Sequence, residues 1–243
     1  MAERPLLAIQ SVSRYFGGLP ALVDVSLDVQ RGEIVGVIGP NGAGKTTLFR
    51  CVVGSLRPSA GRIVFDGRRL DGLSQAAIVA RGVCHTHQTP APFTELSVRD
   101  NVRVGAEFGR HARMARRVTA EVLERTGLAP LADALAGALS VGNLKLLEVA
   151  RALATGPALL CLDEVGGGLS PAELDRVLRL VRSVREAGTT ILYIEHNMRA
   201  IGAVCDRVVV LDFGQRIAEG TPEEVTRNPR VVEAYLGEDA VEA

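Results

Sequence analysis

Short apolar runs and longer mixed stretches alternate along most of the chain. The run Ile34–Ile38 is almost wholly apolar, as in a strand that is buried on both faces. Similar runs predict further core strands at Leu159–Leu162, Thr190–Ile194 and Val208–Leu211. Broken alternation predicts strands at Leu7–Val12, Leu22–Val29 and Gly61–Asp66, with Gly17-Gly18 as a turn between the first two.

Three stretches have the composition or the spacing of helices. They are Lys45 to about Val53, Val98 to about Leu153, and Val177–Glu186. Strands that alternate with helices predict an α/β layered sheet. No internal repeat, low-complexity segment or long linker divides the sequence, so we expect a single domain over residues 1–243.

Composition and charge narrow the class of protein. The chain has 243 residues, of which 47% are hydrophobic and 23% charged, as is typical of globular proteins. Its 28 basic and 28 acidic residues cancel, whereas a dedicated nucleic-acid binder usually has a basic excess. No apolar run approaches the roughly 20 residues of a membrane span, and the N-terminus lacks a secretory pattern. We therefore expect a cytosolic protein that does not bind nucleic acid.

Cysteine and lysine usage add two constraints. The four cysteines lie far apart without C-x-x-C spacing, which argues against a disulfide framework and against a structural zinc site. All basic residues are arginines except Lys45 and Lys145. Because arginine serves nearly everywhere else, each retained lysine raises the question of what requires a compact ammonium group.

A glycine-rich loop joins the Ile34–Ile38 strand to the following helix. It matches G-x-x-x-x-G-K-[ST] with Gly39, Pro40, Asn41, Gly42, Ala43, Gly44, Lys45, Thr46 and Thr47. Its glycines let successive backbone N–H groups turn toward phosphate oxygens, and the helix N-terminus adds partial positive charge. Lys45 can reach the β- and γ-phosphates, and the Thr46 hydroxyl can bind Mg²⁺. The loop is therefore predicted to be a P-loop and not an ordinary turn.

Two acidic residues end the strand predicted at Leu159–Leu162. Asp163 can hold Mg²⁺ directly or through water, and Glu164 can accept a proton from an attacking water. An apolar run followed by Asp-Glu usually marks only a strand that ends in solvent. Downstream of a P-loop, the pattern favours the second acidic element of a nucleotide site.

The segment Leu139–Asn143 precedes a helical stretch. Ser140 and Gly142 can place a hydroxyl and a bare backbone N–H at the helix N-terminus, which would make a second anion site. Serine before a helix is also the ordinary N-cap. The spacing alone does not choose between these two interpretations.

Together with Gln88 and His196, these motifs resemble an ATP-binding cassette (ABC) ATPase subunit, from about Leu7 to Gly237. Phe16–Leu19, Glu195–Met198 and Ala218–Pro222 look most like the cassettes of high-affinity branched-chain amino-acid importers. The resemblance implies an α/β P-loop NTPase fold. It consists of a RecA-like core, an N-terminal antiparallel β subdomain and an α-helical subdomain inserted at about residues 96–155.

The resemblance also implies a role for each matching residue. Phe16 would stack on adenine, Asn41–Thr47 would hold the phosphates, and Thr46, Gln88 and Asp163 would surround Mg²⁺. Glu164 would polarise the water, with Lys45 and Gln88 beside the reacting phosphate, and His196 would contact the γ-phosphate. Ser140 and Gly142 would face the ATP of a second cassette.

The cofactors implied are ATP and Mg²⁺. The implied partners are a second cassette, expected to be a paralogue, two membrane-spanning permease subunits and, indirectly, a substrate-binding protein. Hydrolysis would then drive import of branched-chain or other hydrophobic amino acids from the cytoplasmic face of the plasma membrane.

Three departures from the family pattern bear on activity. Val141 and Asn143 stand where the family most often has Gly and Gln. Val165, followed by three glycines, replaces the usual proline, and Ser170 stands where many cassettes have aspartate. Ser140 and Gly142 remain, so we expect a working site in that segment. Consecutive glycines lose much conformational entropy on ordering, so we expect a mobile loop after Val165. These departures favour slow hydrolysis, but Glu164 and His196, which most decide it, are both present.

Two further features have simpler explanations. Cys84, His85 and His87 are close in sequence, but strand alternation would place Cys84 on the face opposite the histidines, which disfavours a metal site. The basic stretch Arg110–Arg117 favours a solvated helix face over a surface for anionic lipid or a partner.

Other functions remain open on the sequence. The nearest is the cassette of a lipid or lipopolysaccharide exporter, and a more distant one is a non-transport ABC switch protein. A lone P-loop kinase would not explain Ser140, Gly142 and His196 together.

Overall fold

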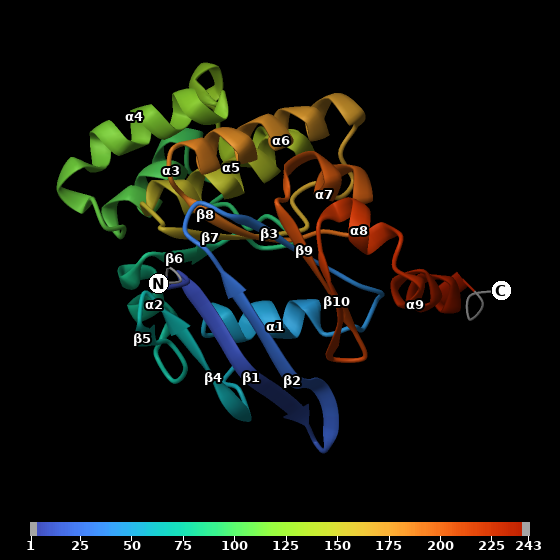
Figure 1. Cartoon of the computed structure of the whole chain (residues 1–243). Helices are drawn as coiled ribbons and strands as arrows, with labels where there is room; N and C mark the ends of the chain where they lie inside the picture. The colour runs from blue at the N-terminus through green and yellow to red at the C-terminus, as the bar shows by residue number, and fades with distance from the viewer. Residues whose placement is uncertain (1–3, 240–243) are drawn as a thin grey trace. The chain divides into compact units, whose positions relative to one another are not determined.

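The computed structural model describes residues 4–239, which form two compact units (Figure 1). The first unit contains the chain up to residue 75 and again from residue 190, and the second contains residues 76–189.

An antiparallel sheet opens the first unit, in the order β2-β1-β4-β5. Its strands are β1 (Leu7–Phe16), β2 (Leu19–Val29), β4 (Ala60–Phe65) and β5 (Arg68–Arg69). In the register of the central strand, Leu7 lies opposite Val29 on one side and Phe65 on the other. The sheet confirms the predicted N-terminal antiparallel subdomain.

Four further strands of the first unit are neighbours in the order β10-β9-β3-β8. They are β3 (Ile34–Ile38), β8 (Thr190–Ile194), β9 (Arg207–Asp212) and β10 (Gln215–Gly220). β3 runs parallel to β8 and β9, whereas β10 pairs antiparallel with β9. Every residue of β3 and β8 is buried, which explains their continuous apolar runs. The helices of this unit are α1 (Lys45–Val52), α7 (Met198–Val204), α8 (Pro222–Thr226) and α9 (Pro229–Asp239).

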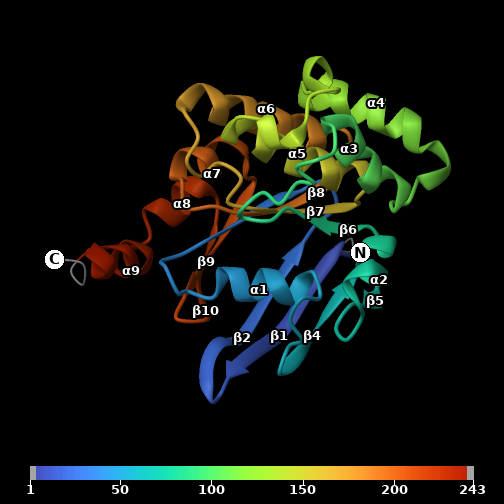
Figure 2. The same ribbon diagram turned by 180° about the vertical axis from the view of Figure 1, so that it is seen from behind.

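The second unit contains two short parallel strands and most of the helices. Its strands are β6 (Val83–His85) and β7 (Leu159–Asp163), and α2 (Gln75–Arg81) starts at its boundary. Between β6 and β7 the chain forms α3 (Val98–Glu107), α4 (Ala115–Thr126) and α5 (Val141–Ala154), and after β7 it forms α6 (Pro171–Glu186). In both Figure 1 and Figure 2, α3, α4 and α5 lie side by side, as the inserted helical subdomain requires. Short 3-10 helices at Ala112–Met114, Ala129–Leu131 and Ala136–Ala138 separate these helices.

The sequence-based strands agree with the structure better than the helices do. β3 and β8 have the predicted bounds, but α6 begins at Pro171 and not at Val177. Ser170 and Glu173 form a capping box there, and Pro171 and Ala172 are exposed, so the apolar spacing of the helix starts only at Leu174. The periodicity also missed α2, α7, α8, α9 and β10, which are short or largely exposed.

All four cysteines are buried and free. Residues 4–239 contain no cluster of three or more His, Cys, Asp or Glu side chains suited to a metal ion. β6 ends at His85, so the alternation of faces predicted for Cys84, His85 and His87 does not extend to His87. The centres of the His85 and His87 rings lie 4.8 Å apart. Over the same described range, no helix is both long enough and apolar enough to cross a bilayer.

Candidate functional site

The P-loop leaves β3 at Ile38 and enters α1 at Lys45. Gly39 has a φ of 148°, and a Cβ there would lie 2.0 Å from the carbonyl oxygen of Leu211. A Cβ on Gly44, at φ 98°, would lie 2.6 Å from the carbonyl oxygen of Ala21. Both positions therefore require glycine. Gly44 is the N-cap of α1, and within residues 4–239 no side chain caps these helical N–H groups, so they can donate to an anion.

Lys45 adds a positive charge at the same helix terminus. Its side chain is buried, and Nζ donates to the carbonyl oxygens of Gly39 at 2.5 Å and Pro40 at 2.7 Å. A cation at a helix N-terminus is unfavourable beside the partial positive charge of the helix dipole. A phosphate group bound there reverses this unfavourable interaction. The next residue, Thr46, is exposed and carries its hydroxyl at the start of α1.

Phe16 and His196 belong to the same unit as the P-loop. Phe16 ends β1 and is 44% exposed, with the Arg14 guanidinium 4.7 Å from its ring centre. His196 follows β8, and 59% of its side chain is exposed. Both side chains are therefore accessible to a ligand.

A buried carboxylate holds the loop that carries His196. Glu195 is 0% exposed and accepts hydrogen bonds from the backbone N–H groups of His196 at 2.9 Å and Asn197 at 3.3 Å. The hydroxyl of Tyr193 donates to the same carboxylate at 3.2 Å. The sequence motif drew attention to His196, but Glu195 fixes its backbone. An acidic residue directly after a fully apolar strand was the available signal.

In the second unit, β7 ends at Asp163 and brings Glu164 next to Gln88. Gln88 Nε2 donates to Glu164 Oε2 at 2.7 Å. The preceding Thr86 is fully buried, and its hydroxyl accepts a hydrogen bond from the Asp163 N–H at 3.1 Å. Pairing of β6 with β7 thus places two motifs together that are 76 residues apart in the sequence.

Ser140 and Gly142 lie at the start of α5. The Ser140 hydroxyl accepts from the Asn143 N–H at 3.4 Å, so this serine is the N-cap. A Cβ on Gly142 would lie 2.3 Å from Oε1 of Glu173, in the first turn of α6. A side chain at position 142 would therefore have to displace the carboxylate end of Glu173. The departure Ser170 caps α6 through the same Glu173.

Comparison with known proteins places these motifs in a family. The family model described as "ABC transporter" matches residues 22–166, and the model described as "Branched-chain amino acid ATP-binding cassette transporter" matches residues 215–241. The chain belongs to the ABC transporter family. It is an ATP-binding cassette and, as such, an ATPase that binds nucleotide.

Individual relatives cover nearly the whole cassette. It is 38% identical to the high-affinity branched-chain amino acid transport ATP-binding protein BraF of Pseudomonas aeruginosa, over 97% of this chain and 99% of that protein. Identity to LivG of Salmonella typhimurium, a protein of the same description, is 40% over the same shares. The lipopolysaccharide export system ATP-binding protein LptB of Escherichia coli is 36% identical, over 96% of this chain and 98% of LptB.

The solved structures agree on the fold. The ADP conformation of MJ1267, an ATP-binding cassette of an ABC transporter, has a TM-score of 0.88 and 31% identity, and the match covers 97% of this chain and all of MJ1267. The predicted cassette fold is confirmed.

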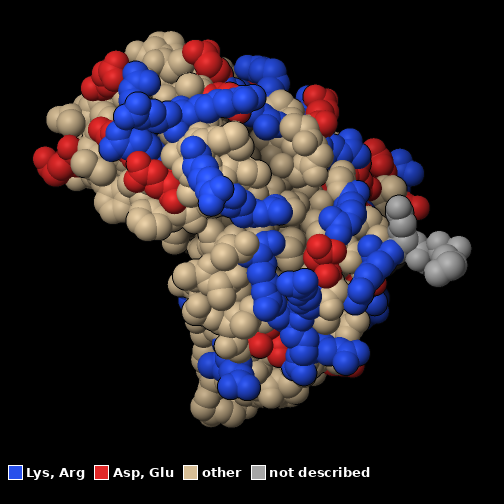
Figure 3. Space-filling model, turned by 90° about the vertical axis from the view of Figure 1, so that its left-hand side faces the viewer, with Lys and Arg blue, Asp and Glu red and all other residues tan. Residues whose placement is uncertain are grey.

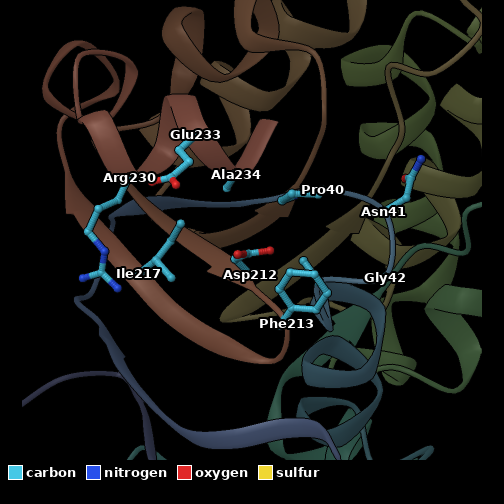
Figure 4. A pocket seen from close by; sticks show the side chains of 10 residues that line it. Pro40, Asn41, Gly42, Asp212, Phe213, Ile217, Arg230, Glu233 and Ala234 are labelled. Carbon is cyan, nitrogen blue, oxygen red and sulfur yellow. The ribbon is translucent and has the colours of Figure 1, made fainter. Parts of the chain in front are cut away.

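The cassette has a pocket of about 550 Å³ beside the P-loop (Figure 4). It is lined by Pro40–Ala43, Asp212, Phe213, Ile217, Arg230, Glu233 and Ala234. Asp212 and Phe213 project from the end of β9 between the P-loop and α9. Two carboxylates and one guanidinium disfavour a polyphosphate here. Of this lining, only the P-loop wall Pro40–Ala43 belongs to the candidate phosphate site.

Charge is unevenly spread although the net charge is zero. Basic side chains predominate on the face of the cassette seen in Figure 3. In the stretch Arg110–Arg117, Arg113, Arg116 and Arg117 are exposed, and Arg117 forms an ion pair with Glu121 one turn along α4. This geometry is that of a solvated helix face.

An ionic cluster around the buried Glu148 holds the segment that carries Gln88. The ring Nδ1 of His87 lies 2.7 Å from Glu148 Oε1, and the His87 N–H donates to the same oxygen at 3.3 Å. Arg151 donates to Glu148 Oε2 at 3.3 Å and to the Ala91 carbonyl at 2.7 Å. The Glu148 hydrogen bond raises the pKa of His87. Burial by itself raises the pKa of Glu148, but His87 and Arg151 outweigh burial and hold it below its usual value. Burial, with the neighbouring His87, lowers the pKa of His85 to about 4.

This cluster predicts a pH-dependent stability difference between the wild type and Glu148→Gln. The raised pKa of His87 stabilises the fold fully below pH 6.5, the usual pKa of histidine. This stabilisation is lost as the pH rises through the raised pKa. The lowered pKa of Glu148 stabilises the fold above pH 4.5, its usual pKa, and this stabilisation is lost as the pH falls through the lowered value. The difference in unfolding free energy, measured by urea titration, is therefore expected to be larger at pH 5.5 than at pH 8.5.

His111→Gln is the control for this measurement, because His111 is exposed on the same unit. It should leave the pH dependence of the wild type unchanged. A Glu148→Gln difference that is equal at both pH values would contradict the pairing.

Proposed function

We propose that the cassette is the ATP-hydrolysing subunit of an importer for branched-chain or other hydrophobic amino acids. The match of residues 215–241 to the branched-chain amino acid cassette model carries this choice of cargo. The similarity to BraF and LivG supports it, and the similarity to LptB makes a lipopolysaccharide exporter the alternative.

Within this function, each unit supplies part of the machinery. The P-loop residues Asn41–Thr47 hold the phosphates at the uncapped N-terminus of α1, and Phe16 stacks on adenine. Glu164 accepts a proton from the attacking water, Gln88 orients that water, and His196 contacts the γ-phosphate. Ser140 and Gly142 face the ATP of a second cassette.

Thr46, Gln88 and Asp163 would hold Mg²⁺. A hydroxyl, an amide oxygen and a carboxylate are the hard oxygen donors that this ion prefers, so the residues present fit it. The ion would neutralise charge that develops on the transferred phosphoryl group. Lys45 adds a second positive charge at the phosphate site.

The assembly we propose contains two cassettes, of which the second is a paralogue, on two membrane-spanning permease subunits. A substrate-binding protein supplies the cargo. The cassettes lie at the cytoplasmic face of the plasma membrane, and residues 1–243 act as a single ATPase domain with residues 96–155 as its helical insertion.

Transport by the native complex tests the cargo. The complex would be purified from its own membranes through a tag on this chain, placed in liposomes with ATP inside, and assayed for uptake of radiolabelled leucine with its binding protein. Uptake by the wild type and none by the Glu164→Gln complex is the expected result. ATPase activity that responds to lipopolysaccharide but to no hydrophobic amino acid would overturn the importer in favour of the exporter.

A further inference from the structure

Lys145 is one of two lysines in a chain that otherwise uses arginine, and the P-loop does not account for it. It lies in the second turn of α5 and is only 9% exposed, although lysine is seldom buried unless it is paired. Its Nζ donates to the carbonyl oxygen of Glu164 at 2.9 Å. The ammonium group therefore binds the main chain of the residue proposed to activate water.

The backbone of Glu164 needs such a contact. Its φ is 46°, in the left-handed region that non-glycine residues rarely adopt, and three glycines follow one residue later. Gln88 contacts the side chain of Glu164, whereas Lys145 contacts its carbonyl oxygen. The carboxylate of Glu164 is thus held from the segment after β6, and its peptide group is held from α5.

The same helix also holds the neighbourhood of Gln88. Lys145, Glu148 and Arg151 follow one another at intervals of three residues, so each is a neighbour of the next on the surface of the helix. Glu148 binds His87, directly before Gln88, and Arg151 binds the Ala91 carbonyl after it. One helix therefore contacts both segments that carry reacting groups.

We propose that Lys145 is a positioning residue for ATP hydrolysis, which fixes the peptide group of Glu164 so that its carboxylate meets the attacking water in the reactive geometry. The inference rests on the proposed function, in which Glu164 activates that water. A compact ammonium group suits this role because it reaches one carbonyl oxygen in a confined space, where the planar guanidinium of arginine is larger.

Lys145→Met tests the proposal, because methionine keeps the unbranched apolar part of the side chain and removes the ammonium group that donates to Glu164. With the purified cassette, kcat for Mg-ATP is expected to fall about 10- to 100-fold, since small misplacements of a reacting group have effects of that size. KM for ATP is expected to change less than about threefold, because the phosphate site is untouched. Lys145→Arg, which retains a cationic donor, should recover part of the rate.

A double-mutant cycle separates positioning from a general loss of stability. Lys145 acts through Glu164, so adding Lys145→Met to Glu164→Gln should lower the residual rate no further. Arg125→Met is the matched control: Arg125 also donates to a carbonyl oxygen, that of Ser183, in the same unit. Its kcat should stay at the wild-type value.

Each outcome has one meaning. If Lys145→Met retains the wild-type kcat, or if its effect adds fully to that of Glu164→Gln, Lys145 does not position Glu164. Thermal unfolding of each variant shows whether a lower rate reflects lost folded protein: a Lys145→Met cassette that is fully folded at the assay temperature and still slow excludes that explanation. If Glu164→Gln itself hydrolyses ATP normally, the proposed role of Glu164 fails, independently of Lys145.

Discussion

Glu164→Gln is expected to lower the rate of ATP hydrolysis by about 100- to 1,000-fold, the usual loss when a general base is removed. Glutamine keeps the shape of the side chain, and its amide oxygen can still accept the hydrogen bond from Gln88 Nε2 that Glu164 accepts at 2.7 Å. Binding of Mg-ATP should therefore persist without turnover, and an ATP-bound dimer with the paralogous cassette should accumulate when both cassettes are present. Phosphate release measures the rate, and light scattering measures the dimer.

Glu186→Gln provides the control, because Glu186 is an exposed glutamate at the end of α6. It should hydrolyse ATP at the wild-type rate. If Glu164→Gln retained more than about half of the wild-type rate, another group would have to accept the proton. A lost rate without a dimer, even at high concentration of both cassettes, would point to a loop weakened by its glycines.

Lys45→Met is expected to weaken Mg-ATP binding by at least about 100-fold. The variant loses a charge-assisted contact to phosphate, and the carbonyl oxygens of Gly39 and Pro40 lose a donor that lies 2.5 Å and 2.7 Å away. Ligand-induced stabilisation gives a direct measurement. At a Mg-ATP concentration of 100 Kd, the wild type should gain about 2.7 kcal/mol of unfolding free energy. The variant should gain no more than about 0.4 kcal/mol at the same concentration, because that concentration is then at or below its own Kd.

Lys145→Met is the natural comparison, because it removes the other lysine of the chain, also from a buried position. It should gain as much stability from Mg-ATP as the wild type does. Equal gains by Lys45→Met and the wild type would show that the phosphates bind elsewhere, for example in the pocket lined by Asp212 and Phe213.

Local sequence was enough for the features whose geometry is local. The P-loop is specified by its glycines, because only glycine permits the φ values and the close backbone contacts found there. Its strand and its helix are adjacent in sequence. β3 and β8 were predicted to the residue because strands buried on both faces need unbroken apolar runs. The family resemblance could be seen from the same motifs, and the comparisons confirmed it.

Exposed elements were harder to predict, because their side chains face solvent and carry little periodicity. α9 and β10 are examples, and so is the first turn of α6, where capping by Ser170 and not apolar spacing decides the start. The sequence did contain the Ser-Pro-x-Glu pattern at that position, which is the signal that would have found it.

The sequence by itself determined that the chain has a P-loop, buried parallel strands and the ordered motifs of an ATP-binding cassette. Only the tertiary structure decided which side chains hold the proposed site residues and their neighbours: Lys145 on Glu164, Glu148 on His87, and Glu195 on the backbone of His196. The first two contacts join residues 19 and 61 positions apart. Contacts between residues so far apart depend on how α5 packs beside β7 and the segment after β6. No short stretch of sequence contains that information.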